Sequence, residues 1–130
     1  MHINIKEQSK YWLKNAEEKW KTAHSLLKSN RYADCLFFCH LTLECLLKGL
    51  VVIDTKKIPL FTHDLLLLAD KTTIILTNDL KEKLQIITTF NLTNRYPDKK
   101  FEFYKKIDKE YSEEWFKNTN KLRLWILKKY

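Results

Sequence analysis

The sequence predicts an all-α fold: an up-and-down bundle of about five helices that forms one domain over residues 1–130. Apolar residues make up 45% of the chain and aromatic residues 13%, enough for a substantial core at this length. One Gly and two Pro leave little material for the tight turns of an all-β fold. Apolar residues also recur at helical spacing through most of the chain.

The first two predicted helices form a hairpin. The first runs from Ser9 to about Ser29, and its apolar residues lie within roughly 80° of one another on a 3.6-residue helix. These residues are Trp12, Ala16, Trp20, Ala23 and Leu27. Ser29 and Asn30 break the pattern and supply an N-cap for a second helix, from Arg31 to about Ile53. Such a short connection predicts antiparallel neighbours.

The second helix is apolar almost all round, which predicts a central position in the bundle. Its segment from Leu36 to Ile53 is nearly as long as a membrane span. It nevertheless contains His40, Glu44 and Lys48, each of which is costly in hydrocarbon. We therefore expect a core helix and no membrane association.

Short elements follow the central helix. A loop covers residues 54–59, and Thr62 is a candidate cap for a short helix through His63 to Ala69. The segment from Thr72 to Thr77 has a β-like composition, but a lone strand has no partner in this sequence.

Two further helices complete the predicted bundle. One begins at Asn78 or Asp79 and continues to about Asn94, before Pro97 excludes helical backbone at Tyr96. The last helix approaches the C-terminus, and its apolar positions are Tyr111, Trp115, Leu122 and Ile126.

Composition limits the classes of function. The net charge of +8 comes almost entirely from Lys, which is typical of a solvated surface. A phosphate-binding role would require these basic side chains to cluster on one part of the surface. The three cysteines lie in one apolar segment, and the N-terminal residues lack the apolar run of a signal peptide, so we expect a reduced, cytoplasmic protein. Cys35 and Cys39 share a helix face but lack two further ligands nearby, so no metal or other cofactor is expected.

His40, Glu44 and Lys48 form one line along the central helix, because residues spaced by four drift by only about 40°. The line is either a structural network, with Glu44 bridging Lys48 and a neighbouring helix, or a site for a ligand or partner. His63 can hydrogen-bond a carboxylate such as Glu44 from across the bundle, in a structural or a catalytic role. Arg95 suits a carboxylate or phosphate, or pairs internally with Asp98 where its helix ends.

Taken in order, these positions resemble the HEPN domain family, specifically the branch encoded beside minimal nucleotidyltransferases. The matching positions are Tyr11, Trp12 and Ala16, then Arg31 and Tyr32, then His40, Glu44, Leu47 and Lys48, then Thr62 to Leu65, then Arg95 to Asp98. The resemblance implies a bundle of about five helices, commonly a homodimer, with a small nucleotidyltransferase as partner in what is often a toxin–antitoxin pair. Many members of this family are metal-independent ribonucleases in which an active-site Arg precedes a His by four to six intervening residues.

That ribonuclease spacing is missing from this chain. No His follows Arg31, Arg95 or Arg123 at the required distance. Arg31 and His40 are nine apart and so lie on opposite helix faces. Two copies could still bring His63 or His40 of one chain near Arg95 of the other.

Three hypotheses follow. The first is a non-catalytic binding subunit that partners a minimal nucleotidyltransferase and contacts nucleotide or substrate phosphate through Lys48, His63 and Arg95. The residues that would support this site are His40, Glu44, Tyr96 and Asp98. The second is a ribonuclease toxin with an atypical Arg and His site, and the third is a purely structural dimerisation protein. No catalytic residue is assigned.

Overall fold

The computed structural model describes residues 3–91 and 105–130 and contains no strand within them. Its helices are α1 (Ile5–Lys28), α2 (Tyr32–Thr55), α3 (Leu65–Asp70), α4 (Asn78–Thr89) and α6 (Lys109–Leu127). The predicted all-α bundle is therefore confirmed. The loop predicted at residues 54–59 runs from residue 56 to residue 64, because α2 continues to Thr55 and α3 begins only at Leu65. Residues 72–77 form no strand, which agrees with the lack of a partner strand in the sequence.

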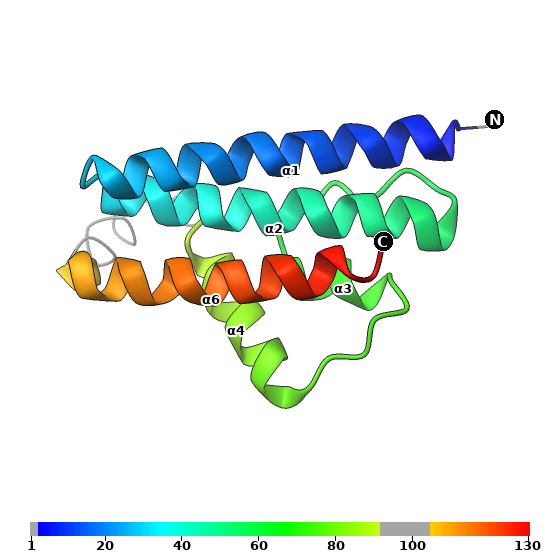
Figure 1. The fold of residues 1–130 in the computed structure, drawn as a ribbon. Coiled ribbons are helices and arrows are strands. Elements are labelled where there is room, and N and C mark those ends of the chain that lie inside the picture. The colour runs from blue at the N-terminus through cyan, green and yellow to red at the C-terminus, as the bar shows by residue number, and fades with distance from the viewer. Residues whose placement is uncertain (1–2, 92–104) are drawn as a thin grey trace.

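Helix α2 occupies the middle of the molecule. It contacts α1, α3, α4 and α6, and Figure 1 shows α1, α2 and α6 running alongside one another with α3 and α4 on one side. By length and composition α2 could cross a membrane, but 78% of its most apolar stretch is buried inside the bundle. These contacts explain why α2 has apolar residues on all sides, because a helix surrounded by other helices exposes little of its surface to solvent.

The turn between α1 and α2 differs from the prediction. Asn30 is not an N-cap; it adopts left-handed backbone with a φ of 60° just after α1. Its amide donates to the Leu27 carbonyl at 3.1 Å, and the Arg31 amide donates to the Leu26 carbonyl at 2.8 Å. These two bonds form a Schellman motif, so Asn30 terminates α1. Helix α1 also begins earlier than expected, at Ile5, because the Asn4 side chain caps it.

The cap of α3 was also predicted at the wrong residue. Asp64 caps α3, since its carboxylate accepts the amides of Leu66 and Leu67 at 3.1 and 3.2 Å. The Thr62 hydroxyl instead accepts the Asp64 amide at 3.1 Å. His63 therefore lies in the loop that precedes α3, and its backbone is free to pack against α2.

Helix α4 ends at Thr89, five residues before the predicted Asn94. The Thr88 and Thr89 hydroxyls donate to the carbonyls of Leu84 and Ile86. The Phe90 and Asn91 amides donate three residues back, to Ile87 and Thr88. Hydroxyls that bond the preceding turn, together with tighter backbone bonds, are typical of a helix end.

Candidate functional site

Glu44 is the centre of the polar stripe on α2, and its side chain is buried, with a residue exposure of 6%. Oε1 accepts a hydrogen bond from His63 Nδ1 at 2.7 Å, and Oε2 accepts one from Lys48 Nζ at 3.2 Å. His40 Nε2 lies 3.8 Å from Oε1, too far for a hydrogen bond. Each carboxylate oxygen thus has one partner, which offsets the cost of burying the charge.

His40 fixes the loop backbone. It is fully buried, and its Nε2 lies 2.8 Å from the carbonyl oxygen of His63. Since a carbonyl only accepts, Nε2 must donate, and Nδ1 has no partner among the described residues. Burial lowers the pKa of His40, against the opposing effects of the His63 carbonyl and Glu44. His40 is therefore a neutral structural group.

Lys48 is buried and not exposed to solvent. Its residue exposure is 7%, and Glu44 is its hydrogen-bond partner. Its Nζ lies 5.3 Å from the ring centroid of Trp12 and 5.8 Å from that of Phe61. Aromatic faces attract cations, so the ammonium is held between a carboxylate and two rings.

His63 is the member of the network that faces solvent. Its side chain is 33% exposed, and Glu44 holds its Nδ1. Its other ring nitrogen, Nε2, has no hydrogen-bond partner among the described residues. A carboxylate that accepts from one ring nitrogen fixes the tautomer and orients the other nitrogen, as in enzymes that use histidine for proton transfer. His63 can therefore exchange one hydrogen bond or proton with a ligand.

The structure brings four of the predicted site residues together: His40, Glu44, Lys48 and His63. The predicted hydrogen bond between His63 and Glu44 is present. Arg95, Tyr96 and Asp98 lie outside the described residues.

Sequence reasoning missed two contacts of this cluster. The sequence placed Trp12 in an amphipathic stripe and among the family's matching positions but indicated no contact with Lys48, and its ring packs against the Lys48 ammonium. Phe61 is 99% exposed and its ring lies 6.4 Å from that of His63. A bulky aromatic residue two positions before a candidate histidine, in a loop, was the signal that could have identified Phe61.

The cysteines do not extend the site. Cys35, Cys39 and Cys45 are buried and free. Burial raises the pKa of Cys45 to about 11, so its thiol is protonated and weakly nucleophilic near neutral pH. Within residues 3–91 and 105–130 no group of three or more His, Cys, Asp or Glu side chains is placed to hold a metal ion.

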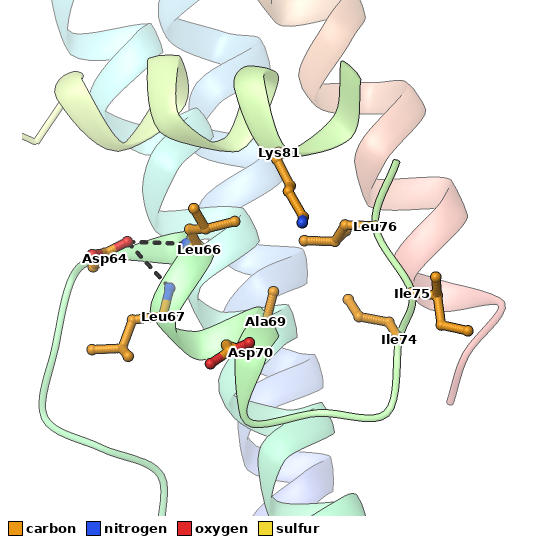
Figure 2. Close-up of a pocket in the computed structure, with 9 residues that line it drawn as sticks. All are labelled: Asp64, Leu66, Leu67, Ala69, Asp70, Ile74, Ile75, Leu76 and Lys81. Atoms are coloured by element: carbon orange, nitrogen blue, oxygen red, sulfur yellow. Dashed lines mark hydrogen bonds between the residues drawn. The ribbon is translucent and has the colours of Figure 1, made fainter. Parts of the chain in front are cut away.

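A separate groove of about 590 Å³ begins beside the polar network. Figure 2 shows its lining, which is mainly apolar: Asp64, Leu66, Leu67, Ala69, Asp70, Ile74, Ile75, Leu76 and Lys81. Asp64 follows His63 in the chain, but its carboxylate is bonded to the α3 amides. The groove therefore adjoins the Glu44 network without sharing its residues.

These features define a class: an all-α bundle whose central helix carries a buried Glu that orients a solvent-facing His. The fold is similar to that in the crystal structure of TT1696 from Thermus thermophilus, with a TM-score of 0.79 and 21% identity. The alignment covers 95% of this chain and 98% of that one. At this identity the likeness establishes the fold.

The family follows from a second comparison, in which residues 9–130 match the HEPN domain model. The chain belongs to the HEPN domain family, as the matching positions along the sequence indicated. No curated protein matches the sequence. Membership supports, in general terms, a function related to nucleotides or RNA.

Proposed function

We propose that this chain is a cytoplasmic HEPN binding subunit that partners a minimal nucleotidyltransferase, in a toxin–antitoxin pair, and holds the phosphate of a nucleotide or nucleotidylated substrate at His63. One observation carries the proposal. His63 is anchored through Nδ1 to a buried carboxylate while a third of its side chain remains exposed. An imidazole held in this way is preorganised for a ligand, so little side-chain freedom is lost on binding. In the protonated ring both nitrogens donate, Nδ1 to Glu44 and Nε2 to a phosphate oxygen.

Lys48 has an indirect role in this proposal. Its ammonium lies against Glu44 and is nearly enclosed, so direct contact with phosphate would require it to leave that carboxylate. In place it offsets the negative charge of Glu44, which would otherwise repel a phosphate bound at His63. Lys48 therefore supports the site, and Arg95 remains the proposed second phosphate contact on the grounds of its sequence position and guanidinium chemistry.

Calorimetric titration with ATP and GTP tests the phosphate site. We expect His63→Ala to weaken binding at least about tenfold, the loss of roughly one charge-assisted hydrogen bond. His24→Ala is the matched control, because His24 is an exposed histidine on α1 next to Phe116 and outside the network. Unchanged affinity in folded His63→Ala and Arg95→Ala variants would refute the site.

Co-expression with the nucleotidyltransferase encoded beside this chain tests the partnership separately. We expect the two proteins to co-purify as a complex, and the His63→Ala variant to retain the complex while losing nucleotide. If the neighbouring gene encodes no nucleotidyltransferase, or if no complex forms, the partnership is wrong whatever the titrations show.

A second candidate function is a metal-independent ribonuclease with an atypical site. The Glu44–His63 pair favours it, since a carboxylate-oriented imidazole can act as a general base. Incubating the purified protein with total RNA in the presence of chelator distinguishes the two functions. Cleavage that disappears in His63→Ala would establish the nuclease, whereas intact RNA would exclude it. A purely structural protein would bind neither nucleotide nor RNA.

A further inference from the structure

Phe61 projects from the loop before α3, beside the Glu44 network. Its side chain is almost fully exposed to solvent, yet its ring centroid lies 6.4 Å from that of His63 and 5.8 Å from Lys48 Nζ. Scattered apolar residues are ordinary on a protein surface, although each one in contact with water is unfavourable. This ring, however, lies directly beside the exposed imidazole of the proposed phosphate site. Its position therefore indicates a role toward the ligand of His63.

The backbone holds Phe61 at the tip of a tight turn. The Thr62 amide donates to the Leu60 carbonyl at 3.0 Å, and a bond that spans two residues forms a γ-turn with Phe61 at its centre. Two residues further along, His40 Nε2 donates to the carbonyl of His63 and fixes the loop on α2. The point from which the ring projects is thus set in advance, which reduces the freedom lost when a ligand binds.

The faces of the Phe61 ring are available to a ligand. The rings of Phe61 and His63 are tilted by 58° and so do not stack on each other. The Lys48 ammonium approaches one face of the phenyl ring, and nearly all of the side chain is open to solvent. A flat group can therefore lie on the ring without displacing any other part of the protein.

The separation of the two rings fits a single nucleotide. In a nucleoside monophosphate, one ribose connects the base to the phosphate. Because His63 and Phe61 are near neighbours, a base can reach the phenyl ring while its own phosphate is bound at His63 Nε2. Stacking on an aromatic side chain is also the usual way in which proteins bind an unpaired base.

We infer that Phe61 is the stacking platform for the base of the nucleotide whose phosphate His63 holds, and that the site favours purines. The inference rests on the proposed function, because it takes the position of the phosphate from His63. Every nucleobase has a π-face, and base preferences at such platforms follow stacking strength. A purine covers more of a phenyl ring than a pyrimidine does. The ligand class is therefore a purine nucleotide, bound through its base and the phosphate next to its ribose.

Ligand-observed NMR with AMP tests the stacking. We expect the wild-type protein to shift the adenine proton resonances upfield, because those protons would lie over the Phe61 ring. Phe61→Leu keeps an apolar side chain without an aromatic face, so it should lose the shift and weaken AMP binding about fivefold or more. Phe61→Trp should retain both. The matched control is Ile58→Ala, an exposed apolar residue of the same loop, which should behave as wild type.

Ribose 5-phosphate separates this inference from the phosphate site, since it carries the phosphate without a base. We expect Phe61→Leu to leave its affinity unchanged, and His63→Ala to weaken the binding of both ligands. If AMP binding depends on His63 but not on Phe61, or if Phe61→Leu weakens both ligands equally, the stacking is wrong and the phosphate site stands. Wild-type protein that does not bind AMP would overturn both proposals. Equal affinities for AMP and UMP would overturn the purine preference.

Discussion

Two sides of α2 are covered in different ways. On one side Gly49 lies against α1 and the C-terminus: a Cβ at this position would be 3.0 Å from Trp12 Cβ and would collide with the Tyr130 hydroxyl. That hydroxyl donates to the Leu46 carbonyl. On the other side, Glu44 meets the loop before α3 through a hydrogen bond to His63. One contact depends on shape, and the other depends on specific polar partners.

The difference shows how one helix serves both stability and a site. The close-packed side joins three segments with little polar chemistry, so its strength depends on the volume of each side chain. The polar side adds little net stability, since the pairing of buried charges mainly offsets their desolvation. What the polar side achieves is orientation: it fixes the loop and directs His63 outward.

The largest expected effect is on the polar side. Glu44→Ala should reduce the free energy of unfolding by about 3–5 kcal/mol, because it leaves the Lys48 ammonium buried without its carboxylate. Chemical denaturation of both proteins at pH 7 measures this. The double variant Glu44→Ala with Lys48→Met should recover much of the loss. A single variant that loses less than about 1 kcal/mol would mean that the network is not desolvated.

The close-packed side should give the next largest effect. Gly49→Ala should reduce stability by about 1–3 kcal/mol, since the added methyl group meets Trp12 and Tyr130. Thermal unfolding gives the size of the loss. Adding Tyr130→Phe removes the hydroxyl and should lessen the effect of Gly49→Ala. If the two substitutions were simply additive, the Tyr130 contact would not be the cause.

A smaller loss should follow His63→Ala, about 1.5 kcal/mol for one hydrogen bond to a charged group whose donor is partly solvated. Lys48 still neutralises Glu44 in this variant, which explains why the expected loss is below that of Glu44→Ala. Denaturant titration provides the value. A loss as large as that of Glu44→Ala would indicate that the hydrogen bond from His63, rather than the ion pair with Lys48, provides most of the stabilisation of the buried Glu44 carboxylate.

The smallest effect should be a pH dependence due to His40. Burial holds its folded-state pKa below the unfolded value of about 6.5, so the unfolded chain binds more protons below that pH. This group therefore decreases stability as pH falls below about 6.5, by no more than about 1.4 kcal/mol per pH unit, the limit for one proton.

His40→Gln should flatten that part of the stability profile, and His24→Gln, in an exposed histidine, should leave it unchanged. Unfolding titrations at several pH values compare the three proteins. An identical slope in wild type and His40→Gln would show that other groups cause the dependence.

Sequence reasoning was accurate where a regular repeat carried the information. The apolar circumference of α2 and the amphipathic pattern of α1 are long, redundant signals, and both helices form close to their predicted positions. Helix ends were less accurate, because several residues compete for one cap. Asp64 rather than Thr62 caps α3, and Asn30 ends α1 instead of starting α2.

The spacing of His40, Glu44 and Lys48 alone determined that three polar side chains share one line on a central helix, because helical geometry converts an interval of four into proximity. Tertiary structure alone decided their separate roles. The loop before α3 lies 19 residues along the chain from Glu44, yet it supplies the imidazole that the carboxylate holds. Trp12 packs against the buried Lys48, with the exposed Phe61 ring 5.8 Å from its ammonium, whereas His63 stays partly exposed. Such distinctions depend on which segments cover the helix, and long-range packing, unlike a local repeat, has no signature in residue spacing.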